Sequence, residues 1–334
     1  MSKDILLDVK NLRVDLPTER GLLHAVRGID FQVRRGEMLC LVGESGCGKS
    51  MTSLALMGLL PPKAQRSAEH IRFAGQDLLP LKEREMARLR GARIAMIFQE
   101  PMTSLNPSYT LGDQLCEALR AHRQVSAAQA RERAVYLLER AGVPQAAERL
   151  GQYPHQLSGG LRQRVMIAMA LMCEPELIIA DEPTTALDVT IQAQILRLIR
   201  ELQQEFGTAV VFITHDLGVV ARIADRVAVM YAGQIVETAP VAELFARPTH
   251  PYTRGLLGCI PVRGKTLPGS RLQSIPGVVP SLIGSVEGCA FANRCPQVQE
   301  LCQQTPLNVP LNERHEVRCV SARPDAPALI AVAA

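Results

Sequence analysis

Hydrophobic and polar positions alternate with a period of two in two segments near the start of the chain, residues 5–16 and 24–33. This period is typical of half-buried antiparallel strands, because successive side chains of a strand point to opposite faces. Short continuous apolar runs, the pattern of strands buried on both faces, occur at 38–43, 93–98, 177–181 and 209–214. The pattern predicts an antiparallel region followed by a buried sheet.

Helical patterns separate these apolar runs. Residues 50–62, SMTSLALMGLLPP, predict a helix that the double proline ends, and residues 191–207 predict an amphipathic helix that ends at Gly207. The interval 111–173 is almost purely helical. Strands that alternate with helices indicate an α/β fold with a mainly parallel core, into which a helical subdomain is inserted at about 100–175.

Composition limits the function classes that remain open. The 334 residues are 47% hydrophobic, and 37 basic against 33 acidic residues give a net charge of +4. The basic residues form no stripe, so we expect no nucleic-acid partner. Charges interrupt the first fifteen residues, and no apolar run is long enough to span a membrane, which predicts a cytosolic chain without a secretion signal.

A change of composition follows Pro261, where the chain becomes rich in Pro, Gly and Cys and loses its periodicity. We therefore expect a large domain over residues 1–259 and a small carboxy-terminal extension over residues 260–334 with little hydrophobic core of its own.

The sequence GESGCGKS, Gly43–Ser50, matches G-x-x-x-x-G-K-[ST] and lies between a predicted buried strand and a predicted helix. The glycines allow backbone N–H groups to point at phosphate oxygens, Lys49 reaches the β- and γ-phosphates, and Ser50 is a ligand for Mg²⁺. The residues expected to bind nucleotide here are Gly43, Ser45, Gly46, Cys47, Gly48, Lys49, Ser50 and Met51.

Two adjacent carboxylates end the buried run LIIADEP, at the edge of the sheet where α/β folds bind ligands. Asp181 is expected to hold Mg²⁺, directly or through water. Glu182 is expected to polarise the water that attacks the γ-phosphate. Alone, such a pair often only caps the next helix; with the upstream phosphate loop it predicts an ATPase.

Four further motifs lie in a fixed order along the chain. LSGGLRQR, residues 157–164, resembles the signature of ABC ATPases, with Leu161 in place of the usual glutamine. IFQEP, TALD and FITHD resemble the family's Q-loop, D-loop and switch segments, with Gln99, Asp188 and His215. The resemblance implies a P-loop NTPase with a RecA-like core, an antiparallel β subdomain and an inserted helical subdomain.

The same resemblance implies how the motifs act. Two ATPase domains dock head to tail, so that Ser158, Gly159, Gly160 and Asp188 contact nucleotide held mainly by the partner's phosphate loop. Gln99 would approach Mg²⁺ and the attacking water, His215 would contact the γ-phosphate, and Glu182 would act as the general base. The aromatic residue on which adenine usually stacks is not evident; His24 is the nearest flat side chain, and an exposed loop histidine is an equal alternative.

RPTHPYTRGLL, residues 247–257, resembles the tail of dipeptide and oligopeptide permease ATPases, a family that includes nickel and glutathione importers. The resemblance implies a heterodimer with a related ATPase beneath two transmembrane permease subunits, at the cytoplasmic face of the inner membrane, served by an extracytoplasmic peptide-binding protein. Dipeptides are the first choice of cargo, and oligopeptides, nickel and glutathione stay open. The alternative is a non-transport ABC ATPase acting on nucleic acid or the ribosome, which usually has a coiled-coil insertion or two cassettes.

Nine cysteines are unlikely to form disulfides in the cytosol. Cys289, Cys295, Cys302 and Cys319 are separated by five, six and sixteen residues, and they could hold a [4Fe–4S] cluster, a Zn²⁺ ion or nothing. The permease resemblance favours the cluster; His315 is a spare ligand. Cys40, Cys116, Cys173 and Cys259 lie in apolar segments and are expected to pack in the core.

Overall fold

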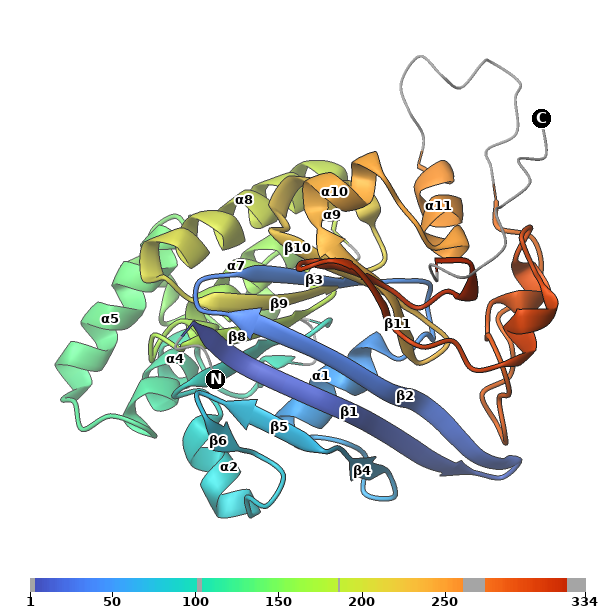
Figure 1. The fold of residues 1–334 in the computed structure, drawn as a ribbon. Helices are drawn as coiled ribbons and strands as arrows, with labels where there is room; N and C mark the ends of the chain where they lie inside the picture. The colour runs from blue at the N-terminus through green and yellow to red at the C-terminus, as the bar shows by residue number, and fades with distance from the viewer. Residues whose placement is uncertain (1–3, 101–103, 186, 261–273, 323–334) are drawn as a thin grey trace.

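Two β-sheets form the framework of the molecule (Figure 1). The structure is a computed structural model that describes residues 4–100, 104–185, 187–260 and 274–322. No helix in these ranges is both long enough and apolar enough to cross a bilayer.

The first sheet is antiparallel and runs in the order β2-β1-β5-β6, with β4 paired to β1. The two alternating segments of the sequence are its long strands, as predicted. Their buried apolar side chains share one core with residues of α1 and of the second sheet. The strands of the first sheet are β1 (Ile5–Thr18), β2 (Gly21–Arg34), β4 (Gln65–Ser67), β5 (His70–Phe73) and β6 (Gln76–Asp77).

The second sheet contains eight strands in the described part of the chain, in the order β12-β13-β11-β10-β3-β9-β8-β7. The five strands from β10 to β7 are parallel, and the other three are antiparallel additions. The four continuous apolar runs are β3, β7, β8 and β9, as predicted. The bounds are β3 (Met38–Val42), β7 (Ile94–Ile97), β8 (Leu177–Asp181), β9 (Ala209–Thr214), β10 (Arg226–Tyr231), β11 (Gln234–Pro240), β12 (Val309–Asn312) and β13 (His315–Val317).

Strand β3 shows why its run is apolar throughout. Met38, Cys40 and Val42 face a core shared with the helices, whereas Leu39 and Leu41 face a second core shared with the antiparallel sheet. A strand buried on both faces has no position for a polar side chain.

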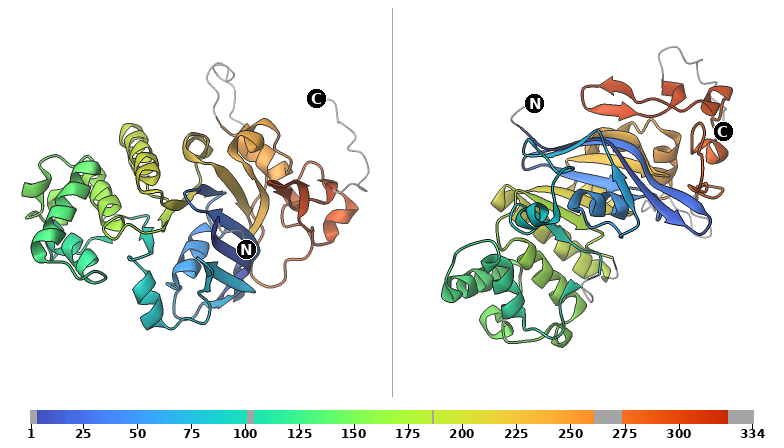
Figure 2. Two further views of the ribbon diagram at one scale, coloured as in Figure 1. Left: turned by 60° about the vertical axis from the view of Figure 1, so that its left-hand side comes forward. Right: turned by 90° about the horizontal axis from the view of Figure 1, so that it is seen from below.

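Helices cover the main sheet, and a group of helices extends from one end of the molecule (Figure 2). Between β7 and β8 lie α4 (Leu111–Arg120), α5 (Ala127–Arg140), α6 (Ala146–Arg149) and α7 (Gly159–Ala170), with a short 3₁₀ turn, η1 (Pro154–Gln156). The remaining helices are α1 (Lys49–Met57), α2 (Glu83–Leu89), α8 (Val189–Phe206), α9 (Leu217–Ile223), α10 (Val241–Ala246) and α11 (Pro251–Gly258).

The two helix ends predicted from the sequence differ in outcome. Helix α8 ends at Gly207, as expected, with that glycine in the left-handed conformation. Helix α1 ends earlier than the double proline, because Gly58 takes up φ 63° and its N–H caps the carbonyl groups of the last turn.

Of the extension expected over residues 260–334, residues 274–322, drawn in orange and red in Figure 1, pack against the preceding part of the chain. Strand β13 pairs with β11, and Ile283 pairs with Leu23 of β2. Three short 3₁₀ turns complete the extension: η2 (Ala292–Arg294), η3 (Glu300–Gln303) and η4 (Val320–Ala322).

A buried histidine attaches this extension. The imidazole of His315, 2% exposed, lies between the carboxylates of Glu237 and Glu243, with Nε2 at 2.9 Å and Nδ1 at 3.1 Å from their oxygens. Both ring nitrogens of His315, the spare metal ligand considered from the sequence, therefore have carboxylate partners in the described structure.

A second buried histidine, His250, predicts that the stability of the protein depends on pH. His250 caps α11, where its Nδ1 accepts a hydrogen bond from the Tyr252 N–H at 3.1 Å. Burial lowers its pKa from 6.5 to about 3. Between these values the unfolded chain binds a proton that the folded chain does not, so the free energy of unfolding rises with pH across this window.

We expect this contribution to fall by about 1.4 kcal/mol for each pH unit below 6.5. Urea unfolding at pH 5, 6 and 7 measures the slope, and His250→Asn, whose amide oxygen can still cap the helix, is the comparison. In the variant, the free energy of unfolding should change less with pH, by about 1.4 kcal/mol for each pH unit. Equal slopes in the two proteins would show that His250 does not titrate on unfolding.

Candidate active site

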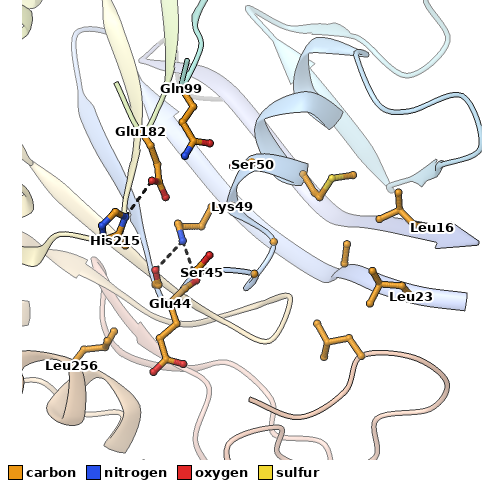
Figure 3. Close-up of a pocket in the computed structure, with 16 residues that line it drawn as sticks. Leu16, Leu23, Glu44, Ser45, Lys49, Ser50, Gln99, Glu182, His215 and Leu256 are labelled. Carbon is orange, nitrogen blue, oxygen red and sulfur yellow. Dashed lines mark hydrogen bonds and ion pairs between the residues drawn. The ribbon is translucent and has the colours of Figure 1, made fainter. Parts of the chain in front are cut away.

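A cavity of about 670 Å³ opens where β3, β8 and β9 end at the edge of the main sheet (Figure 3). It brings together residues from separate parts of the chain. Those predicted from motifs that line it are Gly43, Ser45, Gly46, Gly48, Lys49, Ser50, Met51, Gln99, Glu182 and His215.

The phosphate loop needs its glycines for close packing. A Cβ at Gly43 would lie 2.1 Å from the Met230 carbonyl oxygen, and a Cβ at Gly48, which has φ 102°, would lie 2.3 Å from that of Ala25. No larger residue fits these two positions without moving the backbone.

Lys49 is 4% exposed, and its Nζ donates to the carbonyl oxygens of Gly43 at 2.8 Å and Glu44 at 3.0 Å. The loop thus holds a buried positive charge at the wall of the cavity. Cys47 does not line the cavity in the described structure; the residue is 2% exposed, and burial raises the pKa of its thiol.

Asp181 lies at the end of β8 and is hydrogen-bonded to α1. Its carboxylate accepts hydrogen bonds from the hydroxyl groups of Ser50 and Ser53, both at 3.0 Å. Burial raises the pKa of Asp181, so a bound cation at this oxygen-rich position would stabilise its charged form. Carboxylate and hydroxyl oxygens are the donors that Mg²⁺ prefers.

Glu182 follows in an uncommon backbone conformation, φ 45°, and its carboxylate points toward the cavity. This carboxylate accepts a hydrogen bond from Thr185 Oγ1 at 2.9 Å and lies 3.2 Å from His215 Nδ1. Its side chain is 13% exposed, and that of His215 is 58% exposed. Gln99 points into the same space from the end of β7 (Figure 3).

The signature and D-loop residues lie apart from this cavity. Ser158 and Asp188 are exposed helix caps, accepting hydrogen bonds from the N–H groups of Leu161 and Ile191. Within the described chain neither they nor Gly159 and Gly160 line the cavity. The chain therefore assembles one part of the predicted nucleotide site and leaves the other part on a different surface.

Several residues that line the cavity were missed by the sequence reasoning. Apart from Glu44 they are apolar: Leu16, Leu23, Ala25, Leu256 and Leu282. Of these, Leu16 and Leu23 lie on the side of the cavity away from Glu182 (Figure 3). His24, the flat side chain considered for adenine, instead pairs with Asp15 at 2.6 Å and does not line the cavity in the described structure. Single leucines in distant segments form no recognisable sequence motif. They could be identified only from the cavity that the folded chain forms.

The predicted four-cysteine metal centre is not formed in the described structure, which contains no group of three or more His, Cys, Asp or Glu that could hold a metal ion. The four thiols share one neighbourhood without converging. Cys289 N–H donates to the Cys302 carbonyl oxygen at 2.8 Å, and burial together with the other three thiols raises the pKa of Cys295 to about 11.

The other cysteines agree in part with the expected core positions. Cys40 and Cys173 are buried, and Cys116 packs against the core from a partly buried position. Cys259, at the end of α11, is partly exposed, which corrects its assignment to the core.

Comparisons with known proteins agree with this geometry. The ABC transporter family matches residues 26–185, and the C-terminal region of oligopeptide/dipeptide transporters matches residues 236–302. Among solved structures, a dimeric ATP-binding cassette in a post-hydrolysis state with bound ADP and phosphate superposes with a TM-score of 0.64 at 26% identity, covering 70% of this chain and 98% of that one.

Curated relatives match nearly the whole length. A probable peptide ABC transporter ATP-binding protein of Sinorhizobium fredii is 54% identical, with 95% of each chain covered. The dipeptide transport ATP-binding protein DppD of Bacillus subtilis is 51% identical over 94% of each chain, and the oligopeptide transport ATP-binding protein OppD of Salmonella typhimurium is 50% identical over 91% of this chain and 90% of its own. The chain therefore belongs to the ABC transporter ATP-binding subunits of the dipeptide and oligopeptide permease family.

Proposed function

We propose that this ABC ATPase powers the import of dipeptides and short oligopeptides through a membrane permease. The proposal rests on two features that occur together in this chain. One is a cavity lined by the phosphate loop, Gln99, Glu182 and His215, and the other is a match to the C-terminal region of peptide transporters over residues 236–302. The names of the curated relatives support peptide as cargo. A nickel or glutathione importer is the alternative within the family.

The residues around the cavity suggest a separate role for each in ATP binding and hydrolysis. The N–H groups of Gly43–Ser50 and the ammonium of Lys49 would bind the phosphates, and the apolar side chains of Leu16 and Leu23 would contact the base. Glu182 would take the proton of the attacking water, His215 would hold Glu182 in place and contact the γ-phosphate, and Gln99 would position the water.

The oxygen donors of Ser50 and Asp181, 3.0 Å apart, fit a Mg²⁺ ion, with Gln99 as a further ligand. When bound, this ion neutralises the charge that develops on the phosphate oxygens. Ser53 keeps the Asp181 carboxylate oriented, because it holds the second oxygen of that carboxylate.

The separated signature residues suggest a second subunit. Ser158, Gly159, Gly160 and Asp188 are at or near the surface and outside the cavity, so a related ATPase docked head to tail would complete each nucleotide site. In this arrangement residues 1–259 are the ATPase domain, with the helical subdomain at about 100–175, and residues 260–334 are the extension. We propose a peripheral position at the cytoplasmic face of the inner membrane, beneath two permease subunits that receive peptide from an extracytoplasmic binding protein.

Affinity purification of the tagged chain from detergent-solubilised membranes tests this assembly. We expect a second ATPase and two permease subunits in stoichiometric amounts. In proteoliposomes, dipeptide-loaded binding protein should stimulate ATP hydrolysis, whereas stimulation by nickel or glutathione alone would replace the peptide assignment. A chain that purifies without permease subunits, or with ribosomes or nucleic acid, would overturn it.

We further propose that Cys289, Cys295, Cys302 and Cys319 hold a [4Fe–4S] cluster, with Zn²⁺ as the alternative. Backbone N–H groups of Gln297 and Gln299 donate to the sulfurs of Cys295 and Cys302 at 3.4 Å, an arrangement that stabilises ligating thiolates. Iron and sulfide near four each per chain, after purification without oxygen, would support the cluster. About one zinc would support a structural zinc site, and neither metal would leave free thiols.

A further inference from the structure

An arginine of the carboxy-terminal extension contacts the phosphate loop directly. The guanidinium of Arg294 donates from Nη1 and Nη2 to the two carboxylate oxygens of Glu44, at 2.8 Å and 3.0 Å. The side chain of Arg294 is 5% exposed and that of Glu44 is 27% exposed. Such a two-point, charge-assisted pair fixes both the position and the direction of the carboxylate.

The arginine is itself held firmly. Its Nε donates to the Pro276 carbonyl oxygen at 3.0 Å and its Nη2 to that of Ile275 at 3.2 Å. Its guanidinium also lies 5.7 Å from the ring centre of Tyr231 and 6.0 Å from that of Phe291. Backbone and aromatic contacts thus fix Arg294 before any ligand binds.

Glu44 is the second residue of the phosphate loop, and it lines the ATP cavity. Its N–H donates to the Tyr252 hydroxyl at 3.0 Å, and its carbonyl oxygen accepts from Lys49 Nζ at 3.0 Å. The carboxylate points away from Lys49 (Figure 3). In that direction it meets Arg294.

A carboxylate in a phosphate loop opposes the loop's function, because like charges repel strongly where water is partly excluded. ATP brings several negative charges to the N–H groups next to Glu44. The contact with Arg294 neutralises the carboxylate and keeps it turned away from the phosphates.

We propose that Arg294 is a positioning residue that neutralises Glu44, so that the carboxy-terminal extension sets the affinity of the phosphate loop for ATP. The proposal rests on the proposed role of Gly43–Ser50 in phosphate binding. It concerns ATP affinity and not the hydrolysis step, because Arg294 does not line the cavity in the described structure.

The test measures equilibrium binding of a fluorescent ATP analogue to the full chain, and the KM and kcat of ATP hydrolysis in the assembled transporter. Arg294→Met keeps the buried stem and removes the charge. We expect ATP binding about tenfold weaker, the size of effect from one charged hydrogen-bonded pair, with KM raised and kcat little changed. Glu44→Gln alone removes the charge that Arg294 is proposed to neutralise, and its affinity is the reference for the double variant.

The double variant shows whether Arg294 acts by neutralising the charge of Glu44 or only by supporting the fold of the loop. Without the carboxylate there is no charge to neutralise, so Glu44→Gln combined with Arg294→Met should bind ATP within about threefold of Glu44→Gln alone. A double variant as weak as Arg294→Met would overturn the proposal and leave a structural role. An Arg294→Met chain with unchanged affinity would also overturn it.

Two controls distinguish a specific effect of Arg294 from a general one. Arg314→Met removes an exposed arginine of the same extension and should leave ATP binding unchanged. A loss equal to that of Arg294→Met would show a general effect of the extension, and would overturn the proposal. Lys49→Ala tests the proposed phosphate site itself. If Lys49→Ala fails to bind ATP and Arg294→Met binds it normally, only the role of Arg294 is rejected.

Discussion

Replacement of Glu182 by Gln should lower steady-state ATP hydrolysis about 100- to 10,000-fold, the range for loss of a general base. The amide has nearly the size of the carboxylate and can still accept from Thr185, so the cavity should keep its shape. It cannot take a proton from water. ATP should therefore bind with nearly unchanged affinity while turnover stops, and a nucleotide-bound pair of ATPase subunits should accumulate.

Single-turnover hydrolysis and light scattering on the assembled transporter measure both effects. Glu201→Gln makes the same chemical change at an exposed position of α8 and should leave hydrolysis unchanged. Hydrolysis by Glu182→Gln within about threefold of the unmodified protein would assign the base elsewhere, and the neighbouring His215 would be the next residue to replace.

The sequence predicted four of the five parallel strands of the main sheet, because burial on both faces leaves an uninterrupted apolar run such as Leu177–Asp181. The hairpin of β10 and β11 was missed, although its signal was present. Ala232 and Gly233 join the strands with φ 47° and φ 77°, a turn that favours glycine. An apolar run before such a turn and a second strand pattern after it would have identified both strands.

The phosphate and Mg²⁺ residues could be proposed from sequence because they lie in short motifs, and the structure brings Lys49, Gln99, Glu182 and His215 to one cavity. The apolar residues that line the cavity could not be proposed from the sequence. Leu282 reaches the cavity because the His24 N–H donates to its carbonyl oxygen at 2.9 Å, a contact between segments far apart in the chain. Local patterns carry no information about such pairing.

Nor did any pattern connect Glu44 with Arg294. The sequence reasoning treated the extension as an appendage with its own chemistry, because its composition changes after Pro261. In the structure the extension contributes Leu282 to the lining of the ATP cavity and pairs with the phosphate loop through Arg294. A change of composition identifies a different segment, but it does not show where that segment packs.

The second large effect should come from Lys49→Ala, which we expect to weaken ATP binding at least about 100-fold. The ammonium of Lys49 is the buried positive charge of the cavity wall, and each charged hydrogen bond to phosphate contributes about 1.5–3 kcal/mol. Its loss also leaves the carbonyl oxygens of Gly43 and Glu44 without their donor, which loosens the loop.

Equilibrium titration with a fluorescent ATP analogue measures the loss, and a thermal melt shows whether the variant is folded. Lys63→Ala, an exposed lysine in the turn after α1, provides the matched control and should bind ATP normally. A folded Lys49→Ala chain that binds ATP within about threefold of the unmodified chain would show that the phosphates lie elsewhere. In that case Glu44 and Arg294 would have no phosphate to influence, so this result decides whether the phosphate loop is the centre of the site.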